Sequence, residues 1–171
     1  MVPSSRDEQS RSVPRVPTRR STDTTPAPAR SFVLAPTWES ASIARERLHA
    51  WLQIIVWPPG QTDDLVLAVS EAVSNSVEHG YRVALYQIDV EGHIIVTGRL
   101  VAGPNPSTRH VVLTVADGGQ WREHPGGNDA HRGHGMPIMR SCSSTMSVTA
   151  DLEGTTIVLT SQPVPTIEQP S

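Results

Sequence analysis

Lysine is absent from this chain of 171 residues, and all 14 of its basic residues are arginine. A P-loop nucleotide site requires a Gly-Lys-Ser/Thr sequence, and a kinase of the eukaryotic type requires a strand lysine that contacts the phosphates. Neither kind of site can therefore be built from this sequence.

Cysteine occurs once, at Cys142. A single cysteine forms neither an internal disulfide nor a zinc knuckle, and we expect it to be a small buried residue. No stretch approaches the roughly 20 apolar residues that span a bilayer, and the N-terminus lacks the apolar core of a secretory signal. The sequence thus predicts a cytoplasmic protein with no membrane partner.

Aromatic residues make up only 4% of the chain, and the first 30 residues contain none. That segment is rich in Ser, Thr, Pro and Arg and shows no apolar periodicity, so we expect residues 1–30 to be a disordered tail. Its arginines and acidic residues leave a charge of +3, so the overall charge of -3 places -6 on residues 31–171. An acidic body argues against nucleic acid as a direct partner.

Apolar periodicity places one domain in residues 31–161. We expect a short strand at 31–34, helices at 38–57 and 62–80, antiparallel strands at 93–101 and 109–116, a short helix at 136–143 and a hairpin at 145–160. Thr37 and Thr62 are the candidate N-caps of the long helices. Residues 162–171 should be a loose C-terminal tail. The predicted fold class is α+β, a two-layer sandwich of a mixed, mainly antiparallel sheet packed against about three helices.

The second long helix has two different faces. Four valines lie three or four residues apart on its apolar face, namely Val66, Val69, Val73 and Val77. Glu71 and Asn75 lie at i and i+4 on the opposite face. A carboxylate beside an amide oxygen suits one hard cation and one activated hydroxyl or water. The alternative is a solvated face that happens to include an asparagine.

Three glycine-containing segments follow this helix. Asp117-Gly118-Gly119 ends an apolar strand, where the acid can accept a hydrogen bond from a base amine and the glycines allow a planar ligand to approach. Arg132-Gly133-His134-Gly135 precedes a predicted helix, whose free backbone amides could bind phosphate. Gly154-Thr155-Thr156 precedes the last apolar strand. Taken singly, each segment is explained equally well by an ordinary turn or loop.

Taken together, Glu71-Ala-Val-Ser-Asn75 and the three glycine segments resemble the N box and G boxes of the gyrase, heat-shock chaperone, histidine kinase and mismatch-repair ATPase superfamily. The resemblance covers roughly residues 31–161, and the four motifs occur in the same order. The short form, with His131-Arg-Gly-His-Gly-Met-Pro-Ile-Met-Arg140, looks most like the anti-sigma-factor serine kinases of actinobacteria. It implies a Bergerat-type ATP-binding fold.

The resemblance also implies roles for individual residues, with ATP and Mg²⁺ as cofactors. Glu71 would be the general base toward a substrate serine, Asn75 would bind Mg²⁺, and Asp117 would accept a hydrogen bond from the adenine amino group. Further ATP contacts are implied for Gly119, Arg132, Gly133, His134, Gly135 and either Thr155 or Thr156. Residues 120–132 would form a lid over ATP.

The implied function is that of an ATP-binding regulator and protein serine/threonine kinase. It would phosphorylate a serine of an anti-sigma-factor antagonist and sequester a sigma factor, and such proteins commonly form homodimers. An alternative is a nucleotide-gated clamp that binds these partners without phosphotransfer. His124, His131 and His134, with Asp129 nearby, could instead suggest a metal site, but no cysteine assists them and a solvated lid is the favoured interpretation.

Overall fold

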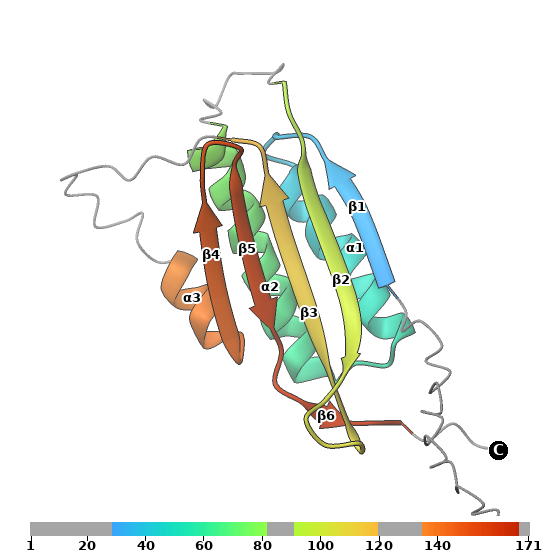
Figure 1. The fold of residues 1–171 in the computed structure, drawn as a ribbon. Coiled ribbons are helices and arrows are strands. Elements are labelled where there is room, and N and C mark those ends of the chain that lie inside the picture. Colours follow the sequence, from blue (N-terminus) through green and yellow to red (C-terminus); the bar gives the residue numbers. More distant parts are fainter. Residues whose placement is uncertain (1–28, 82–90, 120–134, 168–171) are drawn as a thin grey trace, which may run out of the picture.

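The computed structural model describes residues 29–81, 91–119 and 135–167. Six strands and three α-helices form two layers, with both long helices on one face of the sheet (Figure 1). This is the α+β architecture that the sequence predicts. Residues 1–28 of the predicted N-terminal tail and the whole of the predicted lid lie outside the described residues.

The sheet has the strand order β1-β2-β3-β5-β4, and β6 also pairs with β3. The strands are β1 (Ala29–Leu34), β2 (Ile94–Ala102), β3 (Thr108–Asp117), β4 (Thr145–Ala150), β5 (Thr155–Thr160) and β6 (Val164–Pro165). Every ladder among the described residues is antiparallel, whereas the sequence predicts a mixed, mainly antiparallel sheet. Short turns join β2 to β3 and β4 to β5, and so short a connection allows only antiparallel pairing.

The expectation of a loose tail from residue 162 is wrong for Val164 and Pro165. These residues form β6 and pair with Thr108 and Arg109 at the start of β3. The Val164 side chain is 4% exposed, so its burial adds to the backbone pairing. A strand of two residues is too short to produce a period-2 pattern in the sequence.

The helices are α1 (Ser40–Ile54), α2 (Pro59–Asn75) and α3 (Gly135–Ser141), and α2 continues as a π-helix, η1 (Ser76–Gly80). Two predicted caps are wrong. The N-cap of α1 is Glu39 rather than Thr37. Thr62 lies inside α2 and donates its hydroxyl hydrogen to the Pro58 carbonyl at 3.1 Å. Because proline is tolerated at the first helical position, α2 begins at Pro59, three residues earlier than predicted.

The core lies between the sheet and the two long helices. Alternate strand residues point toward the helices and are buried, among them Ile94, Val96, Val111, Leu113, Val115, Ile157 and Leu159. The Trp51 ring of α1 packs over Gly98 of β2, where an added β-carbon would lie 2.8 Å from the ring. The face of α2 that carries Val69 and Val73 is fully buried, so its opposite face remains available for a site.

The end of α1 is closed in an unusual way. The Val56 amide donates to Gln53 and the Trp57 amide donates to Leu52, which is the hydrogen-bond pattern of a Schellman motif. Val56 occupies the left-handed position with φ 50°, where glycine is the usual residue. The Arg109 guanidinium donates to the carbonyls of Ile55 and Val56 at 2.9 Å each, which helps to hold this turn.

None of the helices in the described ranges is long and apolar enough to cross a bilayer.

Candidate functional site

Glu71 and Asn75 lie on the outer face of α2, where the start of α3 packs against them. A β-carbon added to Gly135, the first residue of α3, would lie 3.2 Å from Oε2 of Glu71 and 3.3 Å from both Oδ1 and Nδ2 of Asn75. Both side chains are partly exposed. The glycine therefore leaves space above a carboxylate and an amide that any larger residue would fill.

Asp117 marks the other part of the candidate site, at the end of β3. Its carboxylate is 9% exposed and accepts two hydrogen bonds. The Ser76 hydroxyl donates to Oδ2 at 2.5 Å, and the Gly119 amide donates to Oδ1 at 2.9 Å. Gly80 lies so close that a β-carbon there would be 2.9 Å from Oδ1. The carboxylate is thus held by the π-helix on one side and by the glycine turn on the other.

Thr155 lies directly opposite Asp117 in the pairing of β3 with β5. Its side chain is 3% exposed, and its Oγ1 atom has no hydrogen-bond partner among the described residues. A buried hydroxyl without a partner costs on the order of 1–3 kcal/mol. A ligand with a polar group at this position would supply the missing hydrogen bond.

Thr156 points away from this site. It pairs with Ala116, and successive residues of a strand point to opposite faces of a sheet. Thr155, Ile157 and Leu159 are buried toward the helices, whereas Thr156 is only partly buried. Of the two threonines that the sequence offered, the geometry places Thr155 beside Asp117.

The hairpin between β4 and β5 packs closely on the end of β3. Gly154 has φ +144°, and a side chain there would overlap the Asp117 carbonyl oxygen. Gly119 in turn lies against the backbone of Gly80, so that a β-carbon would overlap it. The glycines at these two positions let three segments meet around one carboxylate.

Sequence reasoning missed two residues that hold this arrangement, Ser76 and Tyr81. The Tyr81 hydroxyl donates to the His93 carbonyl at 2.7 Å and accepts from the amides of His93 and Gly118 at 3.1 Å each. It therefore joins the end of the π-helix to the segment before β2 and to the glycine turn. The available signals were a serine that follows Asn75 within the apolar face of the helix and a tyrosine directly after Gly80.

The predicted site residues thus fall into four groups. Glu71, Asn75 and Gly135 come together on the outer face of α2, and Asp117, Gly119 and Thr155 come together where β3 and β5 meet. Thr156 lies on the other face of the sheet. Arg132, Gly133 and His134 lie outside the described residues, as do His124, Asp129 and His131 of the alternative metal site.

The side chains present fit Mg-ATP. Mg²⁺ prefers oxygen ligands and usually binds through one or two protein groups together with substrate phosphates and waters, which suits the Asn75 amide oxygen beside Glu71. A buried carboxylate next to an unpaired hydroxyl suits a base with an amino group. Within the described ranges, no cluster of three or more His, Cys, Asp or Glu forms a self-contained metal site.

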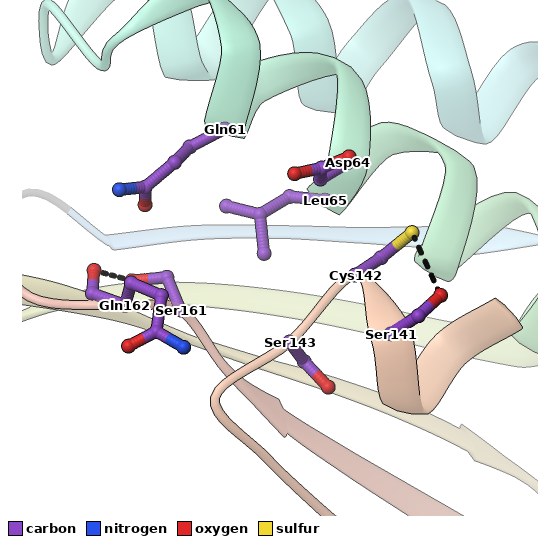
Figure 2. A pocket seen from close by; sticks show the side chains of 8 residues that line it. All are labelled: Gln61, Asp64, Leu65, Ser141, Cys142, Ser143, Ser161 and Gln162. Atoms are coloured by element: carbon purple, nitrogen blue, oxygen red, sulfur yellow. Dashed lines mark hydrogen bonds between the residues drawn. The ribbon is translucent and has the colours of Figure 1, made fainter. Parts of the chain in front are cut away.

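A separate small cavity of about 50 Å³ lies near the start of α2 (Figure 2). It is lined by Gln61, Asp64, Leu65, Ser141, Cys142, Ser143, Ser161 and Gln162. Cys142 is partly exposed here, with its Sγ 3.9 Å from the Ser141 hydroxyl, so the expectation of a buried cysteine is wrong. The residue follows the last turn of α3, where only part of its surface is covered. None of the predicted site residues lines this cavity.

Two solved structures are similar to this chain. The structure of the RsbU and RsbW domains of Rv1364c from Mycobacterium tuberculosis matches with 30% identity and a TM-score of 0.60, over 82% of this chain and 34% of that chain. The chain thus spans about a third of that protein's structure. A histidine kinase domain of the Erythrobacter litoralis EL346 blue-light activated histidine kinase matches with 15% identity and a TM-score of 0.39, over 77% of this chain and 64% of that chain.

The histidine kinase-like ATPase domain, as a family, matches residues 34–161. That range includes Glu71, Asn75, Asp117, Gly135 and Thr155, so the match covers both parts of the candidate site. It also spans well over half of the 171 residues. The chain therefore belongs to the histidine kinase-like ATPase family.

Proposed function

We propose that this protein binds Mg-ATP and transfers the γ-phosphoryl group to a serine of an anti-sigma-factor antagonist, and that it sequesters a sigma factor. The observation that carries the proposal is the meeting of Glu71, Asn75 and Gly135 at the start of α3. The 30% identity to a structure that includes an RsbW domain supports a regulator of this class. A second copy of the chain is a further expected partner.

Each side chain has a defined task in the proposed reaction. The Asn75 amide oxygen would hold Mg²⁺, whose charge would offset the negative charge of the ATP phosphates. The Glu71 carboxylate accepts the proton of the substrate serine as the serine oxygen attacks the γ-phosphorus and the bond to the leaving ADP oxygen breaks. Asp117 accepts a hydrogen bond from the adenine amino group, and Thr155 bonds to another polar atom of the base.

The phosphates would lie over the start of α3. Gly135 supplies the open space there, and backbone amides at a helix start favour anions. Arg132, Gly133 and His134 remain predicted phosphate contacts. Their place in the sequence, directly before Gly135, is compatible with that role.

The experiment compares the wild type with three variants for Mg-ATP binding by calorimetry and for transfer of labelled phosphate to candidate antagonist domains. Glu71→Gln keeps the size of the side chain but cannot accept the proton, so it should bind Mg-ATP and lose transfer by at least about 100-fold. Asn75→Ala should weaken Mg-ATP binding itself. Asp63→Asn is the matched control, since Asp63 is an exposed acid near the other end of α2, and it should behave as the wild type.

The outcomes separate the candidate functions. Transfer by the wild type that is lost in Glu71→Gln supports the kinase. Mg-ATP binding without transfer to any antagonist that the protein binds would favour a nucleotide-gated clamp. Absence of Mg-ATP binding by the wild type would refute both functions.

A further inference from the structure

The Ser76 hydroxyl has two acceptors within reach but only one hydrogen. Its Oγ lies 2.5 Å from Oδ2 of Asp117 and 3.2 Å from the Ala72 carbonyl one turn earlier in the helix. A hydrogen bond to a charged oxygen is shorter and roughly twice as strong as one to a neutral oxygen. The hydrogen therefore points to Asp117, and Ser76 has no donor left for a ligand.

Asp117 in turn offers only acceptor positions to a ligand. Oδ2 accepts from Ser76 and Oδ1 accepts from the Gly119 amide, one fixed donor on each oxygen. Ser76 is 4% exposed and Asp117 is 9% exposed, so water has little access to this pair. Among the described residues, each carboxylate oxygen accepts one donor and so keeps a free lone pair, and an ionised carboxylate has no hydrogen to donate.

We propose that Ser76 is a specificity-determining residue, which makes the base site select a 6-amino purine over a 6-oxo purine. This inference rests on the proposed binding of Mg-ATP. An adenine amino group can donate to the carboxylate that Ser76 holds in place. The oxygen of a 6-oxo purine would instead face the lone pairs of Asp117, with no donor from either side chain.

The role differs from that of a serine that only fills space in the helix. A space-filling serine could be replaced with equal effect on every nucleotide, because all of them would encounter the same altered packing. A serine that orients Asp117 matters only to a ligand that uses Asp117. Its loss should therefore weaken ATP more than an analogue that makes no such hydrogen bond.

The space left by the removed hydroxyl increases the difference between the two nucleotides. In Ser76→Ala, the freed space next to Asp117 can admit a water, which can donate to an oxo group as well as to the carboxylate. Binding of the 6-oxo nucleotide should then improve or stay the same while binding of ATP falls. Both changes move the ratio of the two dissociation constants in the same direction.

The test measures dissociation constants for Mg-ATP and Mg-ITP by calorimetry, because ITP has an oxo group in place of the 6-amino group, with the accompanying hydrogen on N1, and has no substituent at position 2. The wild type should prefer ATP by about 100-fold or more, as expected for a site that hydrogen-bonds a substrate amino group. Ser76→Ala should lower that preference about tenfold. Ser76→Thr retains the hydroxyl and should preserve the preference.

Ser143→Ala is the matched control. Ser143 also bonds to the carbonyl four residues earlier, Met139, at 2.7 Å, but it lies outside the candidate site. It should leave both dissociation constants unchanged. If circular dichroism shows that Ser76→Ala does not fold, Ser76→Cys keeps the size with a much weaker donor and should also lower the preference.

Two results would overturn the inference in distinguishable ways. If Ser76→Ala binds Mg-ATP and the preference stays within about twofold of the wild-type value, Ser76 does not determine specificity, and the proposed function is unaffected. If the wild type binds neither nucleotide, the proposed function and the inference fail together.

Discussion

The unpaired hydroxyl of Thr155 leads to a prediction in which one substitution has opposite effects on folding and on ligand binding. Thr155→Val replaces a hydroxyl by a methyl group of similar size at a position that is 3% exposed. Oγ1 has no partner among the described residues, so its removal relieves a desolvation cost. We expect the free energy of unfolding without nucleotide to rise by about 1–2 kcal/mol.

The same change should weaken the binding of Mg-ATP, since the base loses one hydrogen bond. A typical net value of about 1 kcal/mol for such a bond corresponds to a roughly fivefold higher dissociation constant. In a chain of this length, each added kcal/mol raises the midpoint of thermal unfolding by about 2–4 °C. Thermal unfolding followed by circular dichroism and calorimetric titration with Mg-ATP measure the two effects.

Thr156→Val is the control, because it makes the same substitution at the next residue of β5 on the other face of the sheet. Its unfolding free energy should change by no more than about 0.5 kcal/mol, and its affinity for Mg-ATP should stay the same. The reasoning is refuted if Thr155→Val lowers the thermal midpoint, since the hydroxyl must then have a partner in the free protein. An unchanged affinity for Mg-ATP would remove Thr155 from the base site.

Three further predictions concern single positions. Val56→Gly should raise the free energy of unfolding by about 1 kcal/mol in urea denaturation, because Val56 has φ 50° and is 64% exposed. A lower free energy of unfolding in this variant would show that the left-handed turn carries no strain. Gly98→Ala should lower it by about 1–3 kcal/mol, because the added carbon would lie 2.8 Å from the Trp51 ring. Gly135→Ala should weaken Mg-ATP binding at least about tenfold without loss of secondary structure. Gly60→Ala is its control and should bind as the wild type, because an added carbon there meets nothing within 4 Å. Equal affinities of the Gly135→Ala and Gly60→Ala variants for Mg-ATP would contradict the phosphate site.

Local patterns were enough to predict the parts of the site that lie within one element. The helical period alone places Glu71 and Asn75 side by side, and the structure has both on the outer face of α2. The same holds for the antiparallel pairing of β2 with β3 and for the hairpin of β4 and β5. In each case the signal spans only a few neighbouring residues or one short connection.

The remaining features depend on contacts between distant residues, which one sequence does not reveal. Period-2 alternation shows that Thr155 and Thr156 point in opposite directions, but only the pairing of β5 with Asp117 shows which one faces the site. The bond from Ser76 to Asp117 joins residues 41 positions apart. The sequence does not reveal the early start of α2, because a proline at position 59 can either follow the end of one helix or occupy the first turn of the next.

The two parts of the candidate site are carried by one continuous helical segment. Successive residues of a helix are rotated by about 100°, so Asn75 can face α3 while Ser76 faces the end of β3. The wider turn of η1, which begins at Ser76, then brings Gly80 against Asp117. Since the proposed metal and base contacts share this backbone, a change that shifts α2 should impair both together. Changes at Gly135 or Thr155 should instead impair one part and leave the other in place.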